Sequence, residues 1–117
     1  MNVEQLQAAG INYAEGVRRC AGNEELYHTL LQLICTDESL KHAQTALAEG
    51  DYNSFYKHSY ELKGASGAVS FTTVYELSAK LIDACNAQEY ENVSELFNEL
   101  TAAYEQALEA LKAQRLG

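Results

Sequence analysis

The chain has 117 residues, of which 8 are basic and 17 are acidic, so its formal net charge is −9. A chain of this length fits one domain over 1–117. The negative charge argues against binding to nucleic acid or to an anionic membrane surface, because their phosphate groups would repel it.

The composition predicts a chain that is helical nearly throughout, because it is rich in Ala, Leu and Glu and contains no proline. Two short helices are expected first, over 3–9 and 12–21, and they end at Gly10 and Gly22. Their expected buried contacts are Ile11, Tyr13 and Val17.

The next two predicted helices cover 23–35 and 37–49. Asn23 is a suitable N-cap for the first, and Thr36 or Asp37 for the second. The apolar residues that recur at helical spacing are expected to face the core. They are Leu26, Leu30, Leu33 and Ile34 in the first helix, and Leu40, Ala43 and Leu47 in the second.

A central helix is predicted over 51–68, with Asp51 as its N-cap. Positions three and four residues apart share one face of a helix, and this face is expected to be buried. It consists of Tyr52, Phe55, Ser59, Leu62, Ser66 and Val69.

Two further helices are predicted over 73–87 and 89–113. Thr73 and Glu76 have the spacing of a capping box, which predicts the start of the first of them. Its apolar positions are Leu77, Leu81, Ile82 and Cys85. The last helix has the most regular apolar stripe of the chain, formed by Val93, Leu96, Phe97, Leu100, Tyr104, Ala107, Leu108 and Leu111.

These elements predict an all-α fold, an up-and-down four-helix bundle with a short N-terminal helical cap. The count is four long elements when 23–35 and 37–49 are treated as one broken helix, and short loops make neighbouring helices antiparallel. The residues expected to share one core are Leu62, Val69, Leu81, Phe97, Leu100 and Tyr104.

One face of the central helix carries residues that helix stability alone does not select. Gly64 and Gly67 each cost about 1 kcal/mol relative to alanine inside a helix. Tyr60 and Lys63 lie on the same face, next to the predicted core stripe. A flat, locally basic strip in an acidic chain indicates a surface for docking a protein partner.

The segment 62–69, Leu-Lys-Gly-Ala-Ser-Gly-Ala-Val, resembles the central helix of histidine phosphotransfer (HPt) domains, the four-helix carriers of phosphorelay signalling. Their pattern is His-x-Leu-Lys-Gly followed by small residues. The helix openings at 50–52 and 88–90 are also similar to those of the family, so the resemblance covers the whole chain. It implies a response-regulator receiver domain as partner, with a histidine kinase as a second one, and an N-terminal cap across one end of the bundle.

The alignment places Tyr60 where the family has its phospho-accepting histidine. Relay chemistry requires a nitrogen that is unprotonated near neutral pH, and imidazole, with an ordinary pKa of about 6.5, provides one. A tyrosine hydroxyl, with an ordinary pKa of about 10, does not, and a phosphotyrosine ester is too stable to pass its phosphoryl group readily. We therefore expect a degenerate HPt protein that is not an enzyme and that binds through Lys63, Gly64 and Gly67.

Two alternatives stay open from the sequence. His58 is an alternative phosphoacceptor, although two residues along a helix turn its side chain by about 200° from Tyr60. The second alternative is a helical interaction module unrelated to phosphorelays. His28 and His42 have no companion motif.

The cysteines and the N-terminal residues bear on the compartment. Three cysteines without a C-x-x-C pair indicate neither a disulfide framework nor a metal site, and we expect buried thiols and no cofactor. The first residues have no basic region or apolar run, and no 18 consecutive residues are apolar. We expect a cytoplasmic monomer.

Overall fold

The computed structural model describes residues 2–117 and is all-helical over them, as the sequence predicts. Its helices are α1 (Val3–Ala8), α2 (Tyr13–Arg19), α3 (Glu24–Ile34), α4 (Ser39–Ala48), α5 (Tyr52–Ala68), α6 (Thr72–Asn86), the short 3-10 helix η1 (Tyr90–Asn92) and α7 (Val93–Ala113). The principal extents of the molecule are 40 × 24 × 20 Å.

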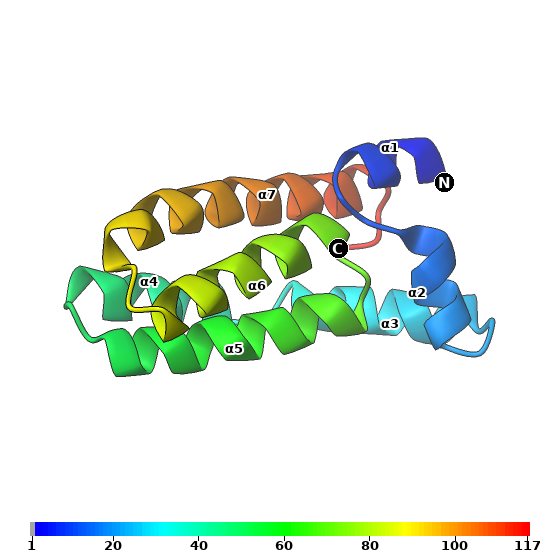
Figure 1. The fold of residues 1–117 in the computed structure, drawn as a ribbon. Helices are drawn as coiled ribbons and strands as arrows, with labels where there is room; N and C mark the ends of the chain where they lie inside the picture. Colours follow the sequence, from blue (N-terminus) through cyan, green and yellow to red (C-terminus); the bar gives the residue numbers. More distant parts are fainter. Residues whose placement is uncertain (1) are drawn as a thin grey trace.

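The long helices lie side by side, and the chain reverses direction at each turn from α4 through α5 and α6 to α7 (Figure 1). α3 and α4 follow one another along the same side of the bundle (Figure 1). α1 and α2 lie at the end where α7 finishes (Figure 1). There the side chain of Gln114 accepts a hydrogen bond from Asn2 N at 2.8 Å and donates one to Gln5 Oε1 at 2.7 Å.

The helix starts follow local side-chain chemistry. Asn23 and Asp51 are N-caps, as predicted, and their side chains accept from Leu26 N at 3.0 Å and Ser54 N at 3.1 Å. These bonds satisfy backbone N–H groups that have no partner within the helix. The N-cap position of α4 is Glu38, one residue after Asp37 and two after Thr36, and Asp37 Oδ1 accepts from Ser39 N at 2.8 Å.

The predicted shared core is confirmed. Its six residues are all buried in one cluster, and Leu62, Leu81 and Leu100 have no exposed surface. Phe55 of α5 meets Phe97 of α7 edge-on, with ring centroids 5.4 Å apart. Such an arrangement contributes beyond the area that the rings bury.

The predicted buried face of α3 is only partly right. Ile34 is buried and Leu30 packs partly against the core, but Leu26 and Leu33 are 45% and 59% exposed. Tyr27 and Leu31, which the pattern did not place there, are fully buried. The Tyr27 hydroxyl donates to the carbonyl of Val69 at 2.7 Å. A buried carbonyl without a partner is costly, so this bond favours the rotation of α3 that turns Leu26 and Leu33 outward.

Three smaller expectations also fail. Tyr52 is 37% exposed, since it stacks on Tyr90 of η1, with ring centroids 4.2 Å apart, rather than facing the core. α6 begins at Thr72 after Phe71, so Thr73 is already helical and makes no capping box. Cys35 is exposed, unlike Cys20 and Cys85.

The N-terminal helices cover the end of the bundle through close backbone contacts. Ile11 is buried against Phe71, and Asn12 N donates to the carbonyl of Ser70 at 2.9 Å. Gly16 of α2 faces the ring of Tyr27 so closely that a Cβ there would lie 2.1 Å from a ring carbon. Only glycine allows α2 this approach.

We expect the Leu62→Ala and Leu100→Ala variants each to lower the free energy of unfolding by about 2–5 kcal/mol, because each removes a fully buried side chain. The matched control is Leu33→Ala, at the leucine that is 59% exposed, which should change it by less than about 0.5 kcal/mol. Urea unfolding followed by circular dichroism measures all three. Equal losses for Leu33 and Leu62 would contradict the observed packing.

Candidate functional site

The residues of the predicted docking surface lie together along the outer side of α5. Tyr60 is the most prominent of them, with 57% of its surface exposed. Gly64, one turn further on, is also exposed, while Lys63 and Gly67 are half-buried towards α6. We call Tyr60, Lys63, Gly64 and Gly67, together with Tyr75 of α6, the α5 surface.

Lys63 is held between two tyrosine rings. Its Nζ lies 5.9 Å from the ring centroid of Tyr60 and 5.7 Å from that of Tyr75. A cation at this distance is attracted by the negative face of each ring. The ammonium group lies over the seam between α5 and α6, where it is a local positive charge on a protein that is acidic overall.

The two glycines of the α5 surface have different surroundings. A Cβ added to Gly64 would meet nothing within 4 Å, so this glycine is not required by any contact within the chain. A Cβ on Gly67 would lie 3.1 Å from two ring carbons of Tyr75. Gly67 thus seats the Tyr75 ring, whereas Gly64 leaves bare helix backbone open to a partner.

An apolar border flanks α5 on its other side. A shallow groove of about 180 Å³ runs between α3 and α5 and is lined by Leu30, Leu33, Ile34, Asp37, Ala65 and Val69. Leu33 stands open to solvent at 59% exposure. Leu30 packs partly against the core, as predicted, but Leu33 was also expected to be buried, so the sequence pattern did not predict this apolar border to the α5 surface.

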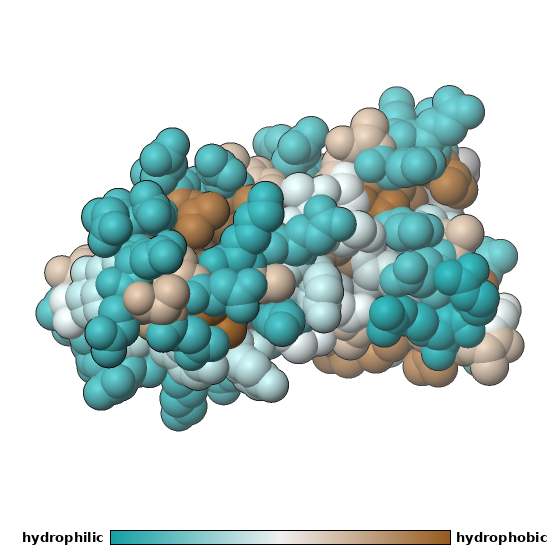
Figure 2. Space-filling model, in the orientation of Figure 1, coloured by the Kyte–Doolittle hydropathy of each residue, from teal (hydrophilic) through white to brown (hydrophobic). Residues whose placement is uncertain are grey.

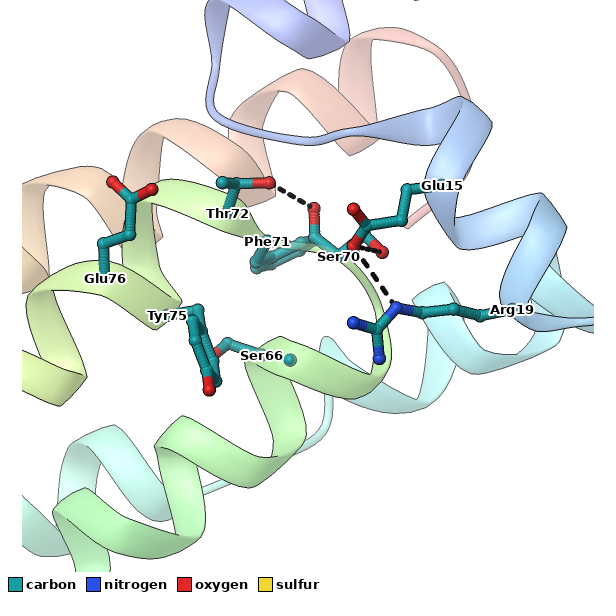
Figure 3. A pocket seen from close by; sticks show the side chains of 9 residues that line it. Glu15, Arg19, Ser66, Ser70, Phe71, Thr72, Tyr75 and Glu76 are labelled. Atoms are coloured by element: carbon teal, nitrogen blue, oxygen red, sulfur yellow. Dashed lines mark hydrogen bonds and ion pairs between the residues drawn. The ribbon is translucent and has the colours of Figure 1, made fainter.

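A larger pocket of about 370 Å³ opens at the C-terminal end of α5, between α2 and α6 (Figure 3). Arg19 and Glu15 of α2 form an ion pair at 3.2 Å, and Ser70 Oγ donates to the same Glu15 carboxylate at 3.1 Å. Gly67 and Tyr75 line this pocket and also belong to the α5 surface.

The face of the molecule seen in Figure 2 is mostly hydrophilic.

His58 lies in a groove away from the exposed Tyr60. Its Nδ1 is 2.7 Å from Glu61 Oε1, and its ring is close to that of His42 on α4. Together with Thr45, Ala46, Glu49 and Ser54, the two histidines line a groove between α4 and α5. The structure therefore does not bring His58 next to Lys63 on the α5 surface.

The tyrosine hydroxyls whose pKa values are raised lie in packed contacts and not on the α5 surface. Burial, with the nearby Glu24 carboxylate, raises the pKa of Tyr13 to about 12. Burial likewise raises the pKa of Tyr104 to about 12, and its hydroxyl donates to the carbonyl of Ile34 at 3.1 Å. Both groups stay protonated at neutral pH and act as hydrogen-bond donors.

Comparisons with protein-family models, with curated proteins and with solved structures gave no match to this chain. Within residues 2–117, none of the helices has both the length and the apolar character needed to cross a membrane.

We expect Gly64→Ala to raise the free energy of unfolding by about 0.5–1 kcal/mol, because alanine favours the helix and its methyl group meets no neighbour. Gly16→Ala is the contrasting variant and should be destabilising, since its methyl group would overlap the Tyr27 ring. Thermal and urea unfolding measure both changes. A loss of stability in Gly64→Ala would show that this glycine serves internal packing.

Proposed function

We propose that this chain is an HPt-like signalling protein that binds response-regulator receiver domains through the α5 surface without carrying phosphate. The observation that carries the proposal is the exposed Tyr60 at the position of the family's phospho-accepting histidine, with Lys63 beside it and Gly64 open at the matching offsets. The protein is a binding module rather than an enzyme.

The chemistry of Tyr60 supports the absence of phosphate transfer. A phenol needs a base to become a nucleophile near neutral pH. The charged group next to its ring is the Lys63 ammonium, which is a cation and cannot accept the proton. His58, the nearest imidazole in sequence, is hydrogen-bonded to Glu61 in the groove on the α4 side.

The shape and charge of the α5 surface support docking to a receiver domain. Gly64 lets a partner reach the helix backbone, and the Lys63 ammonium is a single positive charge that an acidic receiver pocket would attract. Tyr60 and Tyr75 are exposed large rings, a residue type enriched at protein interfaces. An interface centred here would bury all of these groups together.

Binding tests this surface directly. We expect Gly64→Gln to weaken binding to a purified receiver domain by about tenfold or more, because its side chain blocks the approach to α5. Ala102→Gln, which places the same side chain on an exposed position of α7, should bind as the wild type does. A panel of receiver domains is titrated by calorimetry, and the fold of each variant is checked by circular dichroism. Equal affinity of the two variants for a receiver that binds, or no binding by any receiver, would contradict the proposal.

Phosphoryl transfer provides a second test. Incubated with a phosphorylated receiver domain or an active histidine kinase, the wild-type chain and Tyr60→Phe should gain no acid-labile phosphate. Tyr60→His should gain some, because it restores an imidazole beside Lys63 and Gly64. Labelling of the wild type that disappears in His58→Ala would instead make His58 the acceptor.

A further inference from the structure

The groove between α4 and α5 brings together two of the three histidines of the chain. His42 lies on α4 and His58 on α5, and both line an open groove of about 310 Å³. Their ring centroids are 5.0 Å apart with 58° between the planes. This contact is separate from the α5 surface, and binding of a receiver domain there does not account for it.

The separation of the rings suits two imidazoles that share one metal ion. With a bond of about 2.0–2.1 Å from each nitrogen to the ion, centroids lie roughly 4.5–5.2 Å apart for bond angles from about 90° to 109°. The observed 5.0 Å falls inside this range. Imidazole nitrogens are preferred ligands of zinc, copper and nickel ions.

The hydrogen bonding of His58 also suits metal binding. Its Nδ1 lies 2.7 Å from Glu61 Oε1, and since a carboxylate only accepts, this nitrogen carries the proton. In the neutral ring the lone pair is then on Nε2. A carboxylate that fixes the tautomer through the other ring nitrogen is the usual companion of a metal-binding histidine.

The surroundings of His42 leave it accessible to an ion. Its side chain is 53% exposed, and its Nε2 has only a loose contact with Glu38 Oε2 at 3.5 Å. Glu49 lines the same groove, and the net charge of −9 attracts cations to the molecule. Among residues 2–117 there is no preformed group of three ligating side chains, so water would complete the coordination.

We propose that His42 and His58 bind one divalent transition-metal ion, such as Zn²⁺, and thereby link α4 to α5. The bound ion spans the hairpin formed by the two helices and stabilises the folded state by mass action. It leaves Tyr60 and Lys63 free, because they lie on the α6 side of α5.

The test is a calorimetric titration of the full-length chain with ZnCl₂ under conditions that keep the thiols reduced. We expect one ion per chain in the wild type, and a loss of affinity of about tenfold or more in His42→Ala and in His58→Ala. The third histidine gives the matched control, because His28 lies beside Tyr13 and outside the groove. His28→Ala should bind zinc as the wild type does.

The exposed thiol of Cys35 needs its own control, since zinc also binds thiolates. Cys35→Ser should keep the wild-type affinity. Loss of binding in Cys35→Ser or His28→Ala, unchanged binding in both His42→Ala and His58→Ala, or no stoichiometric binding by the wild type would overturn the proposal.

Nuclear magnetic resonance of the unaltered chain gives a readout that needs no variant. Paramagnetic Ni²⁺ added below one equivalent should broaden amide signals of α4 and α5 around residues 42 and 58. Signals near residue 28 should stay sharp. Broadening centred elsewhere would contradict the site.

Discussion

The hydrogen bond from the buried Tyr27 hydroxyl to the carbonyl of Val69, at 2.7 Å, is the interaction on which much of the arrangement depends. The last carbonyls of a helix have no partner within it, and leaving one buried and unpaired costs about 1–3 kcal/mol. The Tyr27 ring that reaches Val69 is itself packed against Gly16 of α2. One side chain therefore joins α3, the end of α5 and the N-terminal cap.

The same bond has a consequence for the surface. With Tyr27 turned inward, Leu33 faces solvent beside α5, and Leu26 is exposed on the same helix. Clustered exposed leucines lower the solubility of a protein, and such apolar patches often mark contact sites. The apolar border next to the α5 surface is thus a product of how α3 is anchored, and a docked receiver domain would have both a polar centre and an apolar edge to contact.

α5 separates two chemically different sides of the molecule. Its buried stripe, which includes Phe55, Leu62 and Ser66, faces the core. On one border the Lys63 ammonium lies between tyrosine rings, and on the other His58 lies beside His42. Residues two positions apart on a helix point in nearly opposite directions. Tyr60 and His58 therefore belong to different surfaces although they are close in sequence. A docked partner and a bound metal ion would therefore occupy different surfaces of α5.

The sequence by itself determined the helical class, the N-caps Asn23 and Asp51, and the buried stripes of α5 and α7, apart from Tyr52 at the start of α5. These features depend on spacing and side-chain chemistry within a few residues, so they can be recognised before the chain is folded. The grouping of Tyr60, Lys63 and Gly64 on one face follows from the same helical period. Only the tertiary structure decided the rotation of α3. The predicted stripe of Leu26, Leu30, Leu33 and Ile34 has helical spacing, but so has the observed one of Tyr27, Leu31 and Ile34. The carbonyl of Val69, 42 residues further along the chain, accepts the hydrogen bond that favours the rotation with Tyr27 inward. Tertiary packing also brought His42 next to His58 and Tyr75 over Gly67, since these contacts join helices whose relative placement no local pattern contains.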